Sequence, residues 1–301
     1  MPIYTSHGYE LSSQWALPAG TKLGPNHEGP SVGLHVQSGP VAWEEPFDTS
    51  EEQAVFSQDE HKLFWPILGR VSITPAGQVY IDAATHAPDG IIPHAILGPI
   101  IAHWIMMNGG IALHANCVDI GGKLIAIVGE SGAGKSSLCA ALVAGGALPH
   151  SDDIVSVDPH NARVPFGTAR LKLNPDVFAL LNLNALSVGP VYSGIDKLSV
   201  EMPLPPDLSI RPLSAVYRLL DAAADAEPEF VPVNGFLAAF TLFSEIFRVN
   251  TAAQAFGAEA LLGRCAALVG RVKVFELRRH RDLSRIQNLA AAVMSHSRTF
   301  D

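Results

Sequence analysis

The pattern of hydrophobic and polar positions divides the chain into two parts. Up to about residue 90, short alternating runs separated by Gly and Pro predict strands, and residues 71–74 and 79–81 predict a β-hairpin. Residues 51–65 are compatible with a peripheral helix or a loop. From residue 91 the apolar runs become longer, and residues 95–107 predict a buried helix with Pro99 in or near its first turn. We therefore predict an α/β fold with a small β-rich N-terminal domain at 1–90 and a larger domain at 91–301.

The larger part begins with two apolar runs joined by a hairpin signal. Residues 111–120 end at Gly121-Gly122, and the β-branched run 124–128 follows as the return strand. This pairing predicts that His114 lies on a strand beside the returning strand. A single His in an apolar run is more often structural than functional, so both interpretations stay open at this point.

A glycine-rich motif follows the return strand directly. Residues 129–136 fit the spacing G-x-x-x-x-G-K-[ST], and the apolar run 137–144 after them predicts a helix. Loop N–H groups and a helix N-terminus together form a site for phosphate. We therefore expect ATP to bind here, with Lys135 at the β- and γ-phosphates and the Ser136 hydroxyl on Mg²⁺. The predicted nucleotide-binding residues are Gly129, Glu130, Ser131, Gly132, Ala133, Gly134, Lys135, Ser136 and Ser137.

An acidic pair, Asp152-Asp153, begins seventeen residues after Lys135 and precedes a strand-like run at 154–157. On an extended backbone the two side chains point in opposite directions, so they serve different purposes. Phosphoryl transfer needs a metal ligand and a group that orients or deprotonates the attacking hydroxyl. The pair is therefore a candidate for these two roles, although such pairs are commonly solvated turns.

Composition narrows the classes of partner. The formal net charge is −9, so the chain has no general attraction for nucleic acid or for an anionic membrane. The three cysteines, Cys117, Cys139 and Cys265, lie far apart and predict neither a disulfide framework nor a zinc site. No signal peptide is visible, and polar residues and prolines interrupt the longest apolar region, 91–113. We expect a cytoplasmic location.

Several of these features resemble one known family. The run Leu113-His114-Ala115, the hairpin, the glycine motif, Gly145 and the acidic pair follow in the order and spacing of the HPr kinase/phosphorylase C-terminal domain. That domain has a P-loop kinase fold akin to phosphoenolpyruvate carboxykinase. The sequence is similar in particular to the HPr-kinase-like proteins encoded beside lasso-peptide precursors. The resemblance is specific over residues 111–157.

The resemblance implies roles for individual residues. Asp152 would be the general base that takes a proton from a serine hydroxyl, and Asp153 would bind Mg²⁺ together with Ser136. His114 would lie near Asp152 and help to set its charge state, and Lys197 would contact phosphate. The resemblance also implies a homo-oligomer, since HPr kinases form hexamers, but the sequence itself carries no interface signal.

The sequence thus favours an ATP- and Mg²⁺-dependent serine kinase whose substrate is a peptide or small protein, by resemblance a ribosomally made lasso-type precursor. Two alternatives stay open: a nucleotide-binding switch without transferase activity, and a small-molecule kinase. The basic residues 278–281 are either a solvated surface patch or a clamp on ATP or an acidic peptide.

Overall fold

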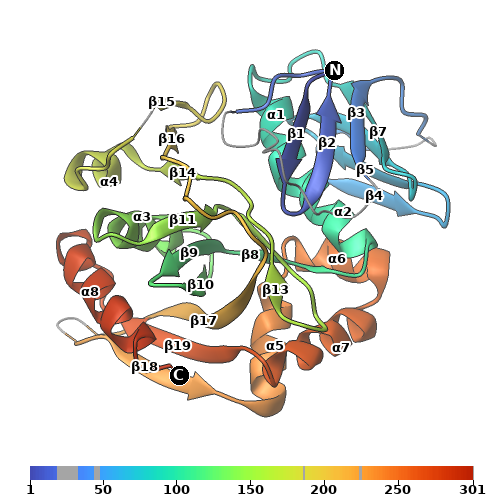
Figure 1. Ribbon diagram of the computed structural model, residues 1–301. Coiled ribbons are helices and arrows are strands. Elements are labelled where there is room, and N and C mark those ends of the chain that lie inside the picture. The colour runs from blue at the N-terminus through green and yellow to red at the C-terminus, as the bar shows by residue number, and fades with distance from the viewer. Residues whose placement is uncertain (19–32, 44–47, 186, 224–225, 301) are drawn as a thin grey trace.

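The protein is a mixed α/β structure with several sheets (Figure 1). The computed structural model describes residues 1–18, 33–43, 48–185, 187–223 and 226–300. Within these ranges, none of the helices combines the length and the apolar character that crossing a membrane requires.

The N-terminal region forms one seven-stranded sheet in the order β1-β2-β3-β7-β6-β5-β4. The predicted hairpin is confirmed, because β6 and β7 pair antiparallel. The segment 51–65, for which the sequence suggested a helix or a loop, instead contributes two paired strands. The strands are β1 (Ile3–Ser6), β2 (Tyr9–Ser13), β3 (Leu34–Ser38), β4 (Gln53–Phe56), β5 (His61–Trp65), β6 (Gly69–Ile73) and β7 (Gln78–Ala83).

A buried helical segment connects this sheet to the rest of the chain. It comprises α1 (Ile91–Ala95), a π-helical turn η1 (Ile96–Ile100) and α2 (Ile101–Met107). The predicted helix is thus present and buried, but it starts earlier, and Pro99 lies in its middle rather than in its first turn. The backbone at Gly98 leaves helical geometry (φ −123°), and this break accommodates the proline ring, which would clash with a regular preceding turn.

The central sheet has the order β11-β9-β10-β17-β19-β18, in which β10, β17 and β19 run parallel. Its strands are β9 (Asn116–Ile120), β10 (Lys123–Val128), β11 (Leu148–Ser151), β17 (Arg211–Asp221), β18 (Glu229–Val233) and β19 (Lys273–Arg279). The predicted pairing of 116–120 with the strand before the glycine motif is confirmed, because β9 and β10 pair antiparallel.

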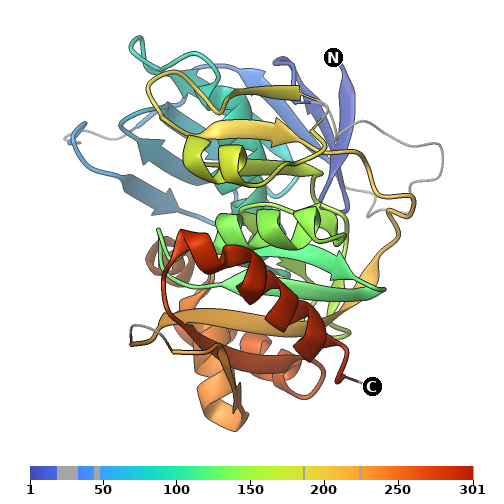
Figure 2. The ribbon, with the colours of Figure 1, turned by 90° about the vertical axis from the view of Figure 1, so that its left-hand side faces the viewer.

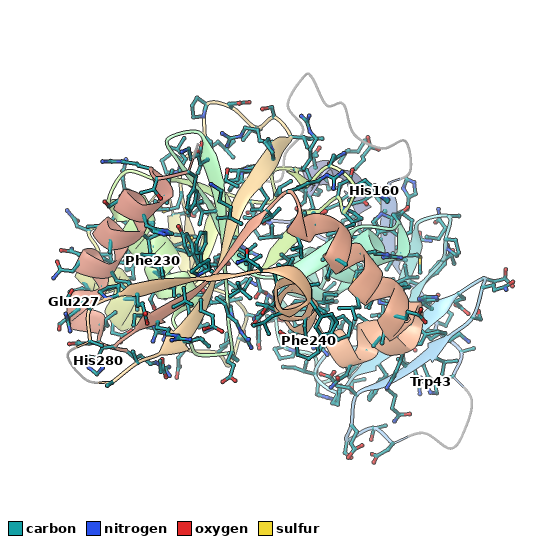
Figure 3. The ribbon with its side chains drawn as sticks, turned by 90° about the horizontal axis from the view of Figure 1, so that it is seen from below. Trp43, His160, Glu227, Phe230, Phe240 and His280 are labelled. Carbon is teal, nitrogen blue, oxygen red and sulfur yellow. The ribbon has the colours of Figure 1, made fainter. Side chains whose placement is uncertain are left out.

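Helices cover both faces of the central sheet. Helices α3 (Lys135–Ala144) and α8 (Ile286–Ser297) pack together on one face (Figure 2). Helices α5 (Gly235–Ser244) and α7 (Ala258–Val269) lie side by side on the other (Figure 3), and α6 (Val249–Phe256) leads from α5 to α7. Successive side chains of β10 point to opposite faces of the sheet. Ile125 and Ile127 pack in the core with α3 and α8, whereas Leu124 and Ala126 pack in the core with α5 and α7.

Two smaller sheets complete the fold. Strand β8 (Ile111–His114) pairs antiparallel with β12 (Ile154–Val157), so that His114 lies opposite Ile154. The prediction that His114 lies on a strand beside β10 is therefore wrong: the chain changes sheets at Ala115, whose N–H donates to the Asp153 carbonyl (3.2 Å). The other sheet contains β14 (Arg170–Leu173), β16 (Leu198–Glu201) and β15 (Ser187–Pro190). The remaining elements are β13 (Arg163–Val164), α4 (Pro175–Leu180) and a 3-10 turn, η2 (Leu283–Arg285).

One hydrophobic core extends from the N-terminal sheet into the larger part of the chain. Ile73 of the N-terminal sheet, Trp104 of α2 and Leu124 of β10 are members of the same buried cluster. The division into domains at residue 90 stays a prediction, and the two parts pack as neighbours around α2.

Candidate active site

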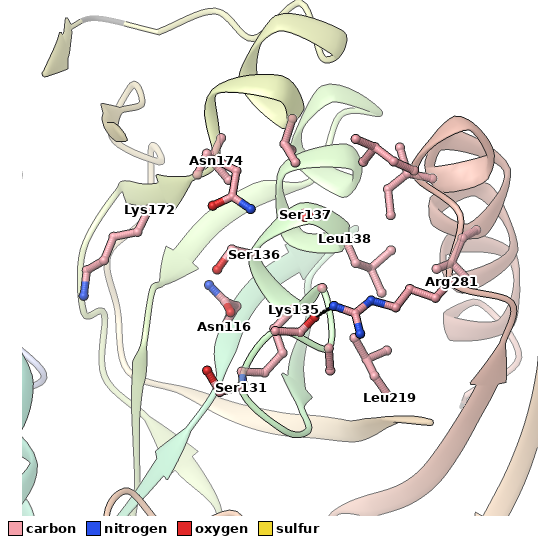
Figure 4. A pocket seen from close by; sticks show the side chains of 18 of the residues that line it. Asn116, Ser131, Lys135, Ser136, Ser137, Leu138, Lys172, Asn174, Leu219 and Arg281 are labelled. Atoms are coloured by element: carbon pink, nitrogen blue, oxygen red, sulfur yellow. Dashed lines mark hydrogen bonds between the residues drawn. The ribbon is translucent and has the colours of Figure 1, made fainter. Parts of the chain in front are cut away.

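The predicted phosphate-binding loop connects β10 to α3 at the C-terminal end of a parallel strand. Gly134 precedes the first helical residue in a left-handed conformation (φ 92°). Gly129 has φ 140°, and a Cβ atom built on it would lie 3.2 Å from the Leu219 carbonyl oxygen. A side chain at either position would be strained, so the loop requires these glycines. The helix N-terminus therefore faces the loop interior (Figure 4).

Lys135 lies inside the curve of this loop. Its Nζ donates to the carbonyl oxygens of Gly129 (2.6 Å) and Glu130 (3.2 Å). Burial lowers the pKa of the ammonium group, and the nearby Glu245 carboxylate opposes that shift. The ammonium is thus held inside the loop against its backbone carbonyls, and from within such a loop a P-loop lysine reaches phosphate.

A buried carboxylate that the sequence analysis missed supports the start of the loop. Glu245 accepts from the Gly129 N–H (3.0 Å) and pairs with Arg218 Nε (3.1 Å). Burial raises the pKa of Glu245, and the Arg218 guanidinium opposes that shift. An isolated Glu within the apolar run 236–249 was the available signal, since a charge in such a run usually has a specific partner.

The basic residues 278–281 divide between solvent and the loop. Arg279 donates to the Ala133 carbonyl and to Asp221, and Arg281 donates to the Gly132 carbonyl (Figure 4). Arg278 is exposed and pairs with Glu276 instead. Two of the arginines therefore hold the phosphate-binding loop, so the patch is more than a solvated surface.

The loop opens onto a cavity of about 320 Å³. Five cationic side chains and three carboxylates line it, which suits an anionic ligand. The cavity brings together most of the predicted site residues; Gly129, Glu130 and Asp152 do not line it. Those on its wall are His114, Ser131, Gly132, Ala133, Gly134, Lys135, Ser136, Ser137, Asp153 and Lys197.

Asp153 is the member of the acidic pair that faces this cavity. Its carboxylate bonds to Lys172 Nζ (2.7 Å) and lies 3.4 Å from His114 Nδ1. Burial alone would raise the pKa of Asp153, but Lys172 and His114 outweigh it and hold the pKa below its ordinary value. Asp153 therefore presents a negative charge to the cavity near neutral pH.

Asp152 faces the protein interior instead and is 4% exposed. One carboxylate oxygen accepts from the Lys172 backbone N–H (3.1 Å), and the other accepts from the Asn116 side-chain amide. Burial raises its pKa to about 6, against the opposing effect of Lys172. Both oxygens are thus engaged by the protein, and the carboxylate does not reach the cavity.

His114 lies beside Asp153 on the wall of this cavity and also lines a second cavity of about 530 Å³. Burial lowers the pKa of His114, and Asp153 opposes that shift. The imidazole is therefore neutral near pH 7 and can accept a proton. The resemblance implied a position near Asp152, but the carboxylate that it meets is that of Asp153.

Two further residues of the site were missed by the sequence analysis. Lys172 touches both aspartates, through its backbone N–H and its ammonium group, and its side chain is 10% exposed. Asn116 lines the cavity close to Ser136 (Figure 4), and its side-chain amide donates a hydrogen bond to Asp152. Asn116 is a polar residue in the apolar run 111–120, and Lys172 is a lysine in the alternating run 170–173. Both patterns are common in ordinary strands, so neither residue stood out in the sequence as a site residue.

The residues present fit Mg²⁺ bound together with a nucleotide. The Ser136 hydroxyl and the ionised Asp153 carboxylate line the same cavity. Mg²⁺ in such sites takes one or two protein oxygens, and phosphate and water complete its shell. Across the described ranges no three His, Cys, Asp or Glu side chains gather into a metal-holding group. The donor set therefore suits a metal that arrives with the nucleotide.

The sequence and the structure were compared with those of known proteins. Neither a protein-family model nor a curated protein sequence matches this chain. Among solved structures, the chain is similar to the HPr(Ser) kinase/phosphatase from Coxiella burnetii, with 14% sequence identity and a TM-score of 0.32. The match covers 62% of this chain and 88% of that chain. A likeness at this level establishes neither a family nor an activity.

Proposed function

We propose that this protein is an ATP-dependent phosphotransferase, a kinase with the P-loop architecture that the sequence resemblance implies. The observation that carries the proposal is the arrangement around Lys135. Its ammonium group lies inside a glycine loop that opens onto a cationic cavity, and the Asp153 carboxylate lines that cavity. A loop that bound phosphate for purely structural reasons would need no acidic group at its open end.

The cavity residues supply what phosphoryl transfer requires. Lys135 and the loop N–H groups would neutralise the phosphates, and Lys172 and Lys197 would add positive charge at the same wall. Mg²⁺ held by Ser136 and Asp153 would supply charge neutralisation when bound with ATP. The protein thereby provides positioning and electrostatics, the main contributions in this chemistry.

The acceptor we propose is a serine hydroxyl on a peptide or small protein, by resemblance a lasso-type precursor. Neutral His114 is placed to take the hydroxyl proton, and Asp153 is placed to stabilise the imidazolium that results. Asp152, assigned as the base by resemblance, would act instead as a positioning residue that holds Lys172 and Asn116. A base must come within about 3 Å of the proton it takes, and Asp152 does not line the cavity.

The test is direct transfer of phosphate. The purified chain is incubated with γ-labelled ATP, Mg²⁺ and the peptide encoded beside its gene, and the peptide is analysed for the mass of one phosphate. Transfer to a serine that disappears with Lys135→Ala supports the kinase. Tight ATP–Mg²⁺ binding without transfer to peptide, protein or small-molecule hydroxyls would instead identify a nucleotide-dependent switch.

A further inference from the structure

A second cavity lies beside the start of the phosphate-binding loop. It measures about 530 Å³, and it shares His114 and Ser131 with the first cavity. Its walls are the start of the loop, Arg218 of β17 and the connection from α5 into α6. Glu52, which precedes β4 of the N-terminal sheet, closes one side. His114 and Ser131 therefore border both cavities.

The charges of the second cavity differ from those of the first. Three glutamates and two arginines line it. Glu52 pairs with Arg248, and Glu245 pairs with Arg218 at 3.1 Å. Among the described residues, Glu130 has no side-chain ion pair. The cavity thus carries an excess negative charge, which disfavours a second anionic ligand and favours a neutral or cationic one.

The remaining walls can hydrogen bond to a peptide. Ser131, Ser244, Asn250 and Thr251 contribute hydroxyl and amide groups. The volume lies within the range of about 300–1,000 Å³ that ligand sites occupy, enough for a side chain and its neighbours. The cavity therefore combines polar walls with a position beside the start of the phosphate-binding loop.

We propose that this second cavity receives the phosphate acceptor, a serine with a basic residue beside it in a peptide segment, and that Glu130, beside the exposed Glu52–Arg248 pair, recognises the basic residue. The inference rests on the proposed kinase activity and adds the acceptor site and its preference. It also gives the N-terminal sheet a role, because Glu52 belongs to the segment that leads into β4.

The transfer step balances across the junction of the two cavities. The serine oxygen forms a bond to the γ-phosphorus, the bond from that phosphorus to the β,γ-bridging oxygen breaks, and ADP leaves in the first cavity. The hydroxyl proton passes to the imidazole of His114, which borders both spaces. The products are ADP, phosphoserine and a proton.

The test obstructs the second cavity without touching the first. Asn250→Trp places a large side chain at the cavity wall, whereas Gln254→Trp places the same side chain one turn further along α6, outside the cavity. Both positions are exposed, so neither variant should unfold the helix. The substrate is a degenerate peptide library with one fixed serine and no other hydroxyl residue, and the nucleotide probe is a fluorescent ATP analogue.

We expect Asn250→Trp to lower kcat/KM for the library at least tenfold, while the affinity for the ATP analogue and the activity of Gln254→Trp stay unchanged. The wild-type chain should enrich library members with Lys or Arg beside the serine. Glu52→Lys should reduce that enrichment, whereas Glu51→Lys, at the neighbouring exposed position outside the cavity, should not.

The outcomes separate the two levels of the proposal. If the wild-type chain transfers no phosphate to the library, both the peptide-kinase function and this inference fail. If it transfers phosphate and Asn250→Trp is as active as Gln254→Trp, only the inference fails. Transfer to free serine as efficient as transfer to the library, or enrichment of acidic neighbours, would also overturn it.

Discussion

The two adjacent aspartates give the sharpest test of the site, because the sequence and the structure assign their roles differently. The resemblance makes Asp152 the general base and Asp153 a metal ligand. The structure buries Asp152 and directs Asp153 into the cavity beside His114. The isosteric variants Asp152→Asn and Asp153→Asn remove one charge each and preserve side-chain shape. Both assignments need the Asp153 carboxylate, so the effect of Asp152→Asn on kcat decides whether Asp152 is the base.

The expected magnitudes follow from the contacts of each group. Asp153→Asn removes the charge that faces the cavity, which would stabilise a protonated His114 and would hold Mg²⁺ together with Ser136. Loss of a group that assists proton transfer typically costs a factor of about 10²–10⁴, so we expect kcat to fall by that amount. Asp152→Asn keeps one acceptor oxygen and forfeits one hydrogen bond. That loss is worth about 1 kcal/mol, which corresponds to a fall in kcat of about tenfold or less.

Single-turnover phosphate transfer measures these effects, and nucleotide affinity and circular dichroism are recorded in parallel. Asp59→Asn, an exposed carboxylate in the turn between β4 and β5, serves as the control and should match the wild-type chain. A fall in kcat of a hundredfold or more in Asp152→Asn, with nucleotide affinity and circular dichroism unchanged, would refute the structural assignment and restore Asp152 as the base.

Three further predictions test the loop and the buried carboxylate. Lys135→Ala should weaken ATP binding by about 10- to 100-fold in calorimetric titrations, because hydrogen bonds from a charged group contribute about 1.5–3 kcal/mol, whereas Lys62→Ala on the N-terminal sheet should bind normally. Arg281→Ala releases the Gly132 carbonyl and should weaken ATP binding severalfold in the same titrations, whereas Arg278→Ala, at the exposed arginine that pairs with Glu276, should not. The pKa of Asp152 is raised to about 6 in the folded state, so the stability that this group contributes is present below about pH 4 and is lost as the pH rises through 6. The unfolding free energy of Asp152→Asn relative to wild type should therefore increase between pH 4 and pH 7, by up to about 3 kcal/mol in urea titrations, and a flat difference would contradict the effect of burial.

Signals close together in the sequence predicted much of the site. The glycine spacing, the strand before it and the helix after it depend on neighbouring residues, and the structure contains all three. The pairing of β9 with β10 likewise followed from a two-residue turn. Local dihedral and hydrogen-bonding preferences determine such features, so a single sequence reveals them.

Contacts between distant segments were not predictable in this way. His114 reaches Asp153 because β8 pairs with β12, about forty residues later in the chain. The period-2 pattern of a strand shows which residues share a face, but it does not name the strand beside it. Lys172 and Glu245 enter the site through such distant packing, and their own segments carry no motif.

The backbone at Asp153 explains how the two aspartate side chains diverge and guides the choice of variant. The sequence argument assumed an extended chain with alternating side chains, but Asp153 has φ 70°, in the left-handed region. Asp and Asn tolerate this region better than other non-glycine residues. Asp153→Asn therefore removes the charge without adding strain, whereas Asp153→Ala would combine both effects. If Asp153→Asn loses transfer while circular dichroism shows that the fold is retained, the loss belongs to the carboxylate and not to the turn that presents it.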